Sequence, residues 1–417
     1  MIKVALVNNM NNNFFAFARY LRDLGIDAHL YEIPNSSLDH FKPQADTFQN
    51  VNELKWLHYF PTNVNGKGWL FFKKELIANE FKRYDLIISC GLSSAFLYRA
   101  GIKSDIIIPY GLDLYQFPFA KIKFSFNLLK FIINIVKTTQ AKYQREAYKN
   151  ARVVITNLSH SLYNESIKKL SINAIDFNLS MLYNMEKVDC QLTTKFSFLK
   201  KHDFIVFNHS RQIWCSNPDN LKDFDKYKGN KRNDKTIKAF TKFLKITKFK
   251  NPVLVLFEYG PDVECSKKLI NELGIQNYVK WIEKSYRKEI MIGLKRASLA
   301  VDQVRERICG IGGTSYEILA SGVPLLTFTN GVIQDKKNLF YNAPIVEVLT
   351  EDDIFNVFID YEKNPQKYKE IGKKAKEWFD ENLGIGLAKK YVKLIELLVK
   401  DKTLTQNDKA VREIFEK

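Results

Sequence analysis

The sequence has little of what marks a secreted, metal-bound or membrane-spanning protein. Its five cysteines are odd in number and widely scattered among 417 residues, and none belongs to a CxxC pair. We therefore expect no disulfide framework and no zinc or redox site, but a cytosolic protein with reduced thiols. No run approaches the roughly 18–20 apolar residues of a spanning helix. The opening MIKVALVNNM lacks the apolar core of a signal peptide, so none is expected.

The charge balance is one-sided. Lysine and arginine number 64 against 46 aspartates and glutamates, which gives a net charge of +18. Such an excess suits nucleic acid, an anionic membrane surface or a phosphate-bearing ligand. No nucleic-acid-binding motif is present and acidic residues are interleaved with the lysines, so no nucleic acid partner is expected. The six histidines show no metal-ligand spacing, and no metal site is predicted.

Apolar, strand-like runs alternate with helical periodicity along the first part of the chain. Each run is rich in β-branched residues and is closed by a polar or glycine-containing turn. The runs are residues 2–7, 28–31, 85–89, 105–109 and 153–156. Continuous apolar strands between helices are typical of a parallel sheet that is buried on both faces.

The alternation restarts after about residue 195. Further runs are residues 204–207, 253–257, 279–282, 299–302 and 325–328. The pattern predicts an α/β protein with two doubly wound, Rossmann-like domains, at residues 1–195 and 196–385. Residues 386–417 form a C-terminal helical segment that is expected to pack back on the first domain. Ligands of such sheets bind beyond the carboxyl ends of the strands, so the loops at those ends are the candidate site.

The densest signal lies between residues 301 and 329. A strand leads into a glycine-rich turn, and a helix is expected to begin near Thr314 and Ser315. Gly312 and Gly313 allow backbone N–H groups to approach an anion at the helix N-terminus. Glu317, expected in the first turn, is able to accept hydrogen bonds from both hydroxyls of a ribose. The same spacing fits a capping box with Thr314 as N-cap and Glu317 at N3, and spacing alone leaves both interpretations open.

This segment resembles the nucleotide-binding segment of the GT-B glycosyltransferases, in particular the retaining group 1 or family 4 enzymes. Their helix reads E-A-x-A-x-G-x-P, and residues 317–324 read EILASGVP. The resemblance implies that Glu317 contacts the ribose of a sugar nucleotide. These enzymes commonly have a second glutamate eight residues earlier, where this chain has Cys309. We therefore expect a divergent subgroup.

A second part of the resemblance follows the first strand of the second domain. The family places an arginine there, and a lysine at the start of a helix reading K-G-x-D-x-L-I-x-A-F. Arg211 takes the first position, and Lys231 opens KRNDKTIKAF with Arg232 where glycine is usual. A departing nucleoside diphosphate develops negative charge, which both cations stabilise. Taken alone, the two residues fit better as members of a basic surface, and their positions beside the Glu317 segment favour the functional interpretation.

The remaining candidates carry weaker signals. The asparagine-rich loop at residues 8–13 stands where the family often has glycines; asparagine tolerates left-handed geometry, and Asn12 is a candidate donor-binding residue. Asp113 lies in a glycine-and-aspartate loop after another strand and is a candidate base or acceptor ligand. His209, beside Arg211, is a candidate ligand contact. The alternatives are plain polar turns for the first two and a core histidine for the third.

Residues 115–142 combine phenylalanine, leucine and isoleucine with interspersed lysines. The stretch is too short and too charged to span a bilayer, and it suits an interface with anionic lipid. The alternative is a core helix with a lysine-bearing solvated face. We expect a cytoplasmic protein with a candidate peripheral site for the inner face of the plasma membrane.

Together these features predict a metal-independent glycosyltransferase with Arg211, Lys231 and Asp113 as catalytic candidates. The resemblance implies transfer of a sugar, with retention and without a cofactor, from a UDP- or GDP-linked donor. The expected acceptor is a glycan, a lipid-linked molecule or a protein, in bacterial surface-polysaccharide or glycoconjugate biosynthesis. Two alternatives stay open. One is another nucleotide-sugar enzyme on this fold, such as an epimerase or hydrolase, and the other is a non-catalytic homologue that serves as a partner protein.

Overall fold

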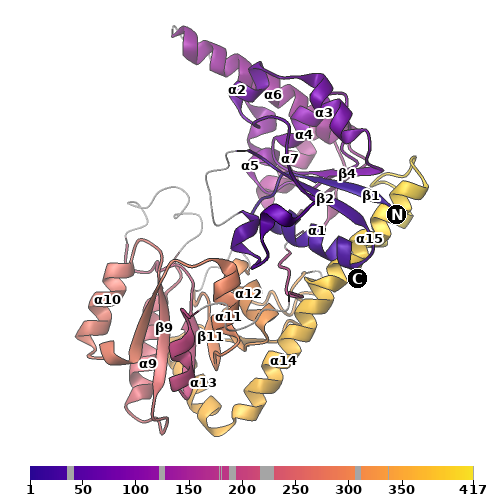
Figure 1. Ribbon diagram of the computed structural model, residues 1–417. Helices are drawn as coiled ribbons and strands as arrows, with labels where there is room; N and C mark the ends of the chain where they lie inside the picture. Colours follow the sequence, from indigo (N-terminus) through magenta and orange to yellow (C-terminus); the bar gives the residue numbers. More distant parts are fainter. Residues whose placement is uncertain are drawn as a thin grey trace. The chain divides into compact units, whose positions relative to one another are not determined.

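The computed structural model describes residues 1–34, 42–121, 127–177, 179, 181–186, 194–216, 230–305, 311–336 and 338–416 (Figure 1). The chain forms two compact units. Unit 1 comprises Met1–Tyr183 together with Ile385–Lys417, and unit 2 comprises Asn184–Gly384. Residues 184–186, 194 and 195, which the sequence pattern groups with the first domain, belong to unit 2.

Unit 1 is built on a parallel sheet with the strand order β3-β2-β1-β4-β5-β6-β7. Val4 on β1 lies opposite Ala28 on β2 and Leu86 on β4, so β1 is the strand from which the order runs both ways. The strands are β1 (Lys3–Val7), β2 (Asp27–Glu32), β3 (Leu57–Tyr59), β4 (Leu86–Ser89), β5 (Ile106–Ile107), β6 (Val153–Thr156) and β7 (Ile175–Asp176).

Helices cover both faces of this sheet, because successive residues of a strand point to opposite sides. Val4 and Leu6 belong to the core cluster that includes α1 and α15, whereas Ala5 and Val7 belong to the cluster that includes α3 and α4. The helices are α1 (Asn13–Asp23), α2 (Gly66–Leu70), α3 (Lys74–Phe81), α4 (Ser93–Arg99), α5 (Leu112–Tyr115), α6 (Leu128–Asn150), α7 (Ser161–Leu170), α15 (Ile385–Lys400) and α16 (Lys409–Arg412).

The C-terminal helices are an integral part of unit 1. The rings of Phe17 on α1 and Tyr391 on α15 lie 4.9 Å apart, centroid to centroid. Arg152, just before β6, donates to the backbone oxygens of Leu398 and Leu404 at 2.9 and 3.0 Å. Figure 1 shows α15, in yellow, alongside the indigo elements α1 and β1. The chain therefore returns to its first unit after completing the second.

Unit 2 repeats the same plan with a parallel sheet in the order β10-β9-β8-β11-β12-β13. Its strands are β8 (Phe204–Asn208), β9 (Pro252–Glu258), β10 (Val279–Glu283), β11 (Leu299–Val301), β12 (Leu325–Thr327) and β13 (Ile345–Glu347). Its helices are α9 (Asn233–Leu244), α10 (Val263–Glu272), α11 (Arg287–Leu294), α12 (Gly313–Ser321), α13 (Glu351–Lys363) and α14 (Pro365–Asn382).

The expected class of fold is therefore confirmed as an α/β protein with two Rossmann-like parallel sheets. Ten of the strands correspond to the apolar runs of the sequence, and β6 agrees to the residue. Three short strands were not predicted: β3, β7 and β13. They read LHY, ID and IVE, and these short mixed sequences are only partly buried, so they carry no apolar run.

Candidate active site

The strand order of each sheet reverses at one point, and such a point opens a crevice at the carboxyl ends of the strands. In unit 1 the reversal lies between β1 and β4, and in unit 2 it lies between β8 and β11. In unit 2 the chain leaves these strands at Asn208 and Val301. The residues that follow are those that the sequence marked as candidates for binding a nucleotide sugar.

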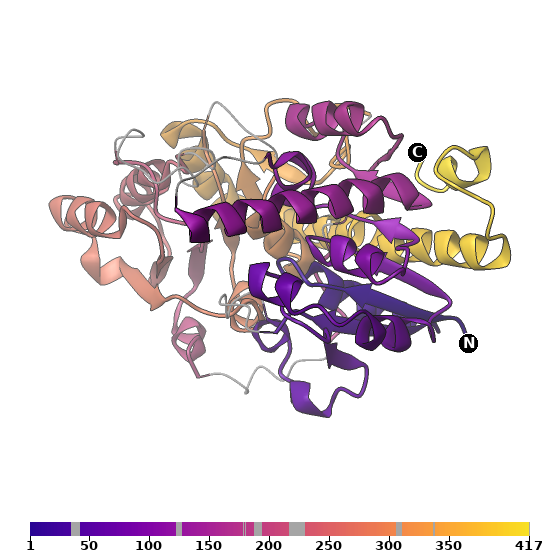
Figure 2. The same cartoon turned by 90° about the horizontal axis from the view of Figure 1, so that it is seen from above.

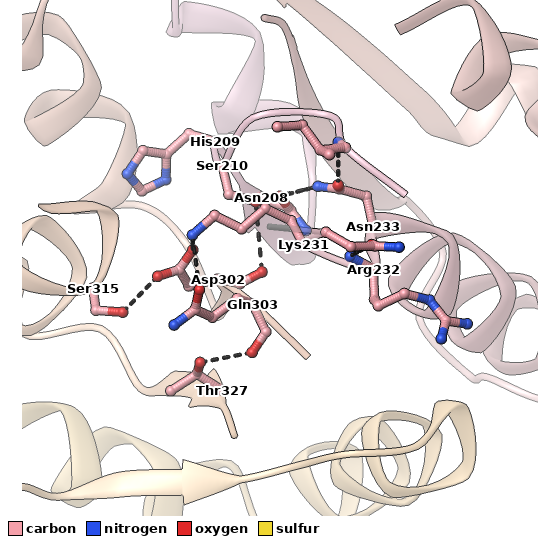
Figure 3. Close-up of polar contacts among 12 residues, drawn as sticks. Asn208, His209, Ser210, Lys231, Arg232, Asn233, Asp302, Gln303, Ser315 and Thr327 are labelled. Atoms are coloured by element: carbon pink, nitrogen blue, oxygen red, sulfur yellow. Dashed lines mark hydrogen bonds and ion pairs between the residues drawn. The ribbon is translucent and has the colours of Figure 1, made fainter. Parts of the chain in front are cut away.

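Lys231 is held at this crevice by groups that follow β11. Its Nζ lies 3.3 Å from Oδ1 of Asp302 and 3.0 Å from Oε1 of Gln303. The Asp302 side chain is fully buried, and that of Lys231 is 16% exposed. Figure 3 shows the lysine side chain extended toward both acceptors. Its ammonium is therefore fixed in position while part of it stays open to solvent.

The same aspartate ties Lys231 to the start of α12. Ser315 Oγ donates to Oδ2 of Asp302 at 2.7 Å, on the side away from the lysine (Figure 3). The backbone N–H of Val304 donates to the oxygen of Lys231 at 3.2 Å. One buried carboxylate thus joins the segment before α9, the end of β11 and the first turn of α12.

A second ion-paired cluster surrounds Glu317 on α12. Nε2 of His209 lies 2.8 Å from Oε2 of Glu317, and Nε of Arg287 lies 2.8 Å from Oε1. Burial opposes ionisation of Glu317, but the hydrogen bond from His209 and the charge of Arg287 outweigh it, so the pKa of this carboxyl lies below its usual value. Glu317 is therefore an ionised, buried acceptor on α12 that faces the end of β8 through His209.

His209 retains one ring nitrogen for a further contact. An ionised carboxylate only accepts hydrogen bonds, so Nε2 carries the proton that faces Glu317. Nδ1 is buried and has no hydrogen-bond partner within the part of the chain that the structure describes. Arg287 is the first residue of α11, which follows the end of β10. No sequence motif marks this strand-end position, so Arg287 is not among the predicted site residues.

Helix α12 does not have the capping box that its spacing also allowed. The helix begins at Gly313 with Gly312 as N-cap, and no side chain caps it. Glu317 therefore lies beyond the first turn, which corrects the expected placement, and it points to His209 and Arg287 instead of the helix end. A Cβ added to Gly312 or Gly313 would meet no described atom within 4 Å. Among the described residues, nothing therefore crowds the two glycines that precede Thr314.

Arg211 lies in the loop that leaves β8. Its guanidinium carbon lies 5.2 Å from the centroid of the Tyr259 ring. The loop is fixed on its neighbour by backbone bonds, from Gln212 N–H to the Tyr259 oxygen at 2.7 Å and from Asp262 N–H to the Gln212 oxygen at 3.0 Å. The backbone of Lys231 joins this loop as well, since its N–H donates to the Ile213 oxygen at 2.6 Å. Arg211 and Lys231 therefore belong to one hydrogen-bonded assembly.

Arg232 occupies a backbone conformation that explains why glycine is usual at this position. Its φ is 57°, in the left-handed region that side chains with a Cβ rarely adopt. The Asp234 carboxylate accepts from Nε of Arg232 at 2.9 Å, and Asn233 Oδ1 accepts from the N–H of Ile213 at 3.1 Å. The turn that presents Lys231 is therefore kept by local side-chain bonds. Residues 217–229, which precede this turn, lie outside the described residues.

In unit 1, Asp113 is committed to the backbone. Its carboxylate accepts from the N–H groups of Gly91 at 2.8 Å, Tyr110 at 3.0 Å and Gly111 at 2.9 Å. Burial raises the pKa of Asp113, while these three amides oppose the rise. The side chain thus joins two loops at the reversal point of the first sheet, and its oxygens are already engaged.

The asparagine-rich loop has the left-handed geometry that glycine would supply. Asn8, Asn11 and Asn12 have φ values of 76°, 54° and 58°. Asn12 is buried, and its amide donates to the Lys42 oxygen at 2.9 Å, so this side chain serves the loop itself. Beneath the loop, Glu32 accepts from Asn9 Nδ2 at 2.5 Å. Burial raises the pKa of Glu32 to about 7, although Asn9 and Lys42 act to lower it. No motif in the sequence marks this carboxyl.

The cysteines depart from the expectation of free thiols. Cys215, after the Arg211 loop, forms a disulfide with Cys265 in the first turn of α10, with their Cα atoms 6.6 Å apart. Cys90 is free and buried. No local spacing predicts this pair, because the two residues are 50 positions apart. Cys190 and Cys309 lie outside the described residues. Cys309 is the residue that stands where the family commonly has its second glutamate.

Comparison with solved structures identifies the class of fold. Alr3699/HepE from Anabaena in complex with UDP shares 14% identity over 96% of this chain and 100% of its own, with a TM-score of 0.53. Its complex with UDP-glucose gives 13% identity, 97% and 99% coverage and a TM-score of 0.52. A glycosyltransferase from Rickettsia africae ESF-5 shares 13% identity over 96% of this chain and 99% of its own, with a TM-score of 0.50. These likenesses show the two-unit fold of the GT-B class.

A sequence match to a family lies inside unit 2. Residues 225–378 match the model of the group 1 glycosyl transferases, and this stretch carries Lys231, Asp302 and Glu317. The match covers part of the second unit, and the fold of the whole chain is that of the GT-B class. No curated protein matches the chain by sequence.

Proposed function

We propose that the protein transfers a sugar from a nucleotide-sugar donor whose diphosphate binds at the crevice between β8 and β11. The observation that carries the proposal is the fixed ammonium of Lys231, held by Asp302 and Gln303 beside the start of α12. A helix N-terminus and a positioned cation form a site for a phosphate group. Both belong to the stretch that matches the group 1 family.

The chemistry gives each residue a role. When the bond between sugar and phosphate breaks, negative charge develops on the departing diphosphate. Arg211 and Lys231 stabilise that charge more in the transition state than in the ground state, which accelerates the reaction. Gly312 and Gly313 offer backbone N–H groups without a Cβ in the way. Thr314 and Ser315 complete this first turn.

Glu317 and His209 suit the nucleoside and sugar hydroxyls. Glu317 is ionised and already paired, so it accepts a ribose hydroxyl without having to lose a proton. His209 Nδ1 is buried and has no hydrogen-bond partner in the described region, so it is available to a ligand hydroxyl. Uridine is the proposed base, because Alr3699/HepE was crystallised with UDP and with UDP-glucose.

We propose retention of the anomeric configuration, as the family resemblance implies. In that mechanism the departing phosphate takes the proton of the acceptor hydroxyl, and no protein base is needed. This agrees with the Asp113 carboxylate, whose oxygens are engaged by backbone amides. The acceptor is proposed to be a glycan, lipid-linked molecule or protein of bacterial glycoconjugate biosynthesis. Its binding is assigned to the first domain and donor binding to the second.

The test is a panel of nucleoside diphosphates and their sugars, followed by thermal shift and by product analysis. UDP is expected to stabilise the protein, and Arg211→Ala and Lys231→Ala to lose that stabilisation. Lys238→Ala is the matched control, because Lys238 lies on α9 and its exposed ammonium pairs with the Asp234 carboxylate at 3.8 Å. Absence of a shift with every nucleotide contradicts the enzyme hypothesis. Conversion of the donor to free sugar or to an epimer, without transfer, favours the alternative enzymes.

A second proposal concerns the start of α6, which we assign to an anionic membrane surface. Leu128 and Leu129 are 72% and 67% exposed, and Ile132, Ile133 and Ile135 are also exposed. Lys130 and Lys137 are exposed among them. In Figure 1 these turns project from the rest of unit 1, and Figure 2 shows the length of the helix. Apolar side chains with interspersed lysines favour the interface of an anionic bilayer.

The rest of α6 follows the alternative interpretation. From Val136 onward the helix packs into unit 1 through Gln140, Ala141, Gln144, Ala147 and Tyr148. The core-helix hypothesis therefore describes residues 136–150, while residues 128–135 have no core to cover. No helix of the described ranges has the length and apolar character to cross a membrane. Residues 122–126 of the predicted stretch lie outside those ranges.

Sedimentation with vesicles tests this proposal. Vesicles that contain phosphatidylglycerol should pellet the protein at low salt, and neutral phosphatidylcholine vesicles should not. Leu128→Asp with Leu129→Asp should abolish pelleting. Leu76→Asp serves as control, because Leu76 on α3 is 52% exposed and lies outside the segment. Equal pelleting of the double variant and the parent protein would refute the membrane assignment.

A further inference from the structure

The disulfide between Cys215 and Cys265 lies at the base of the loop that carries Arg211. We propose that this pair is a site of reversible thiol–disulfide exchange, which adds a covalent tie between the Arg211 loop and α10 when oxidised and removes that tie when reduced. The pair and its exchange do not depend on the proposed function. The consequence for nucleotide binding rests on the proposed function.

The loop is shaped to keep the two sulfur atoms adjacent in both redox states. One oxygen of Asp262 accepts from the N–H groups of Trp214 at 2.6 Å, Cys215 at 2.8 Å and Ser216 at 3.1 Å. Trp214 Nε1 donates to Ser266 Oγ at 2.8 Å. These bonds contain no sulfur and persist when the disulfide opens. Closure therefore needs no rearrangement of the backbone.

The Asp262 carboxylate that makes these contacts is suited to keep them. Burial opposes its ionisation, but the hydroxyl of Ser216 and the three amides outweigh burial, so the pKa of Asp262 lies below its usual value. Gly260 allows the neighbouring loop to approach, since a Cβ there would lie 2.5 Å from the Gln212 oxygen. The two loops are thus packed backbone against backbone beneath the disulfide.

The positions of the two sulfur atoms define the direction of exchange. Cys215 is exposed, whereas Cys265 is half-buried in the first turn of α10. An incoming thiolate attacks Sγ of Cys215, the S–S bond breaks, and the electron pair leaves on Cys265. The helix N-terminus stabilises this thiolate, which makes it the better leaving group.

The second step balances the reaction. The other thiol of a dithiol reductant attacks the mixed disulfide, closes the reductant's own disulfide and releases Cys215 as a thiol after it takes up a proton. Two electrons have then passed to the protein. Oxidation is the reverse, with oxidised glutathione or a similar disulfide as the two-electron acceptor.

Reduction removes the only covalent restraint that the described residues place on the Arg211 loop. Arg211 then depends on the bonds of Gln212 and Asp262 and on its contact with Tyr259. A less restrained cation binds a diphosphate more weakly, because ordering it costs entropy on binding. We expect the affinity for UDP to fall by about fivefold or more on reduction, within the usual range of coupling between two sites.

The exchange itself is tested on the full-length chain with N-ethylmaleimide and peptide mapping. After treatment with oxidised glutathione, Cys215 and Cys265 should resist labelling, and after dithiothreitol under native conditions both should react. Cys90 is an internal control, since it is buried and should stay unlabelled until the protein unfolds. Free thiols after oxidation, or a disulfide that dithiothreitol opens only in denaturant, would overturn the proposal. Protection that a chelator removes would also overturn it, because Cys215, Asp262 and Cys265 would then bind a metal ion.

The coupling is tested by UDP titration of the oxidised and reduced protein. Cys215→Ser is the matched control, because it keeps the Asp262 contacts and should bind UDP equally well with or without dithiothreitol. Equal affinity of both redox forms of the parent protein would overturn the coupling. No UDP binding in either form would instead count against the proposed function, while the labelling result would still decide on the exchange site.

Discussion

His209, at the end of β8, hydrogen bonds to Glu317 on α12 with Nε2 and Oε2 2.8 Å apart. The two residues are 108 positions apart in the sequence and come from the two sides of the reversal point. Arg287 completes the group from α11. The residue that the family resemblance assigns to ribose binding is therefore also a structural link between three elements of unit 2.

Glu317→Gln is expected to destabilise the protein by about 1–3 kcal/mol. The neutral amide no longer balances the positive charge of Arg287. Its NH₂ group faces the N–H of His209 or of Arg287, so one buried donor is left without an acceptor. Urea unfolding measures the loss. Glu272→Gln is the control and should change stability by less than about 0.5 kcal/mol, because Glu272 is exposed and pairs only with Lys268 on the surface. Equal stability of both variants would show that the link carries no energy.

Gly312→Ala is expected to separate donor binding from stability. The added Cβ meets no described atom within 4 Å, so the free energy of unfolding should change little. The methyl group would stand where a phosphate approaches the start of α12, so the affinity for UDP should fall about tenfold or more, by analogy with the glycines of other phosphate-binding turns. Calorimetric titration and urea unfolding of one preparation give both values. Unchanged affinity would mean that the diphosphate does not bind at this turn.

Asp302→Asn is expected to lower kcat by about ten- to hundredfold with little change in the KM for the donor. The variant keeps an oxygen toward Lys231 or Ser315 but loses the negative charge that orients the Lys231 ammonium. Small misplacements of catalytic groups lower kcat by factors of this size. Steady-state kinetics with the donor found above measure both constants. Asp352→Asn is the control, since Asp352 binds Lys242 on the surface. A variant in which only the KM rises would contradict a positioning role.

Stability should fall between about pH 4.5 and 7 because of Glu32. The pKa of this carboxyl is raised from 4.5 to about 7 in the folded protein, chiefly by burial. The folded state therefore binds the proton of the Glu32 carboxyl more tightly than the unfolded state. The stability that Glu32 contributes is fully present below pH 4.5 and is lost as the pH rises to about 7. Glu32→Gln should abolish this loss, so that at pH 8 the variant is more stable by about 2–3 kcal/mol.

Urea unfolding of the parent protein and the variant at pH 5 and at pH 8 measures this difference. Glu75→Gln is the control, because Glu75 is exposed on α3 and should leave the pH dependence unchanged. The same slope for the parent protein and Glu32→Gln would show that Glu32 is not the group responsible.

The helices and strands were predictable wherever local pattern and tertiary burial agree. The run 153–156 became β6 without change, because a continuous apolar segment between turns has one stable place, the interior of a parallel sheet. Strand β13 was not predictable, since IVE is half-buried at the sheet edge and is defined by its pairing with β12. The start of α12 moved to Gly313 because no side chain caps it.

The sequence by itself determined the class of fold, the loops that form the candidate site, and the positions of Arg211 after a strand, Lys231 before a helix and Glu317 within a helix, because periodicity and turn residues act over short distances. Only the tertiary structure decided which partners these side chains meet. Asp302 holds Lys231 across 71 positions and Arg287 holds Glu317 across 30. It also closed the disulfide between Cys215 and Cys265. Hydrogen bonds, ion pairs and disulfides require atoms within a few ångströms, and the order of strands in the sheet sets those distances.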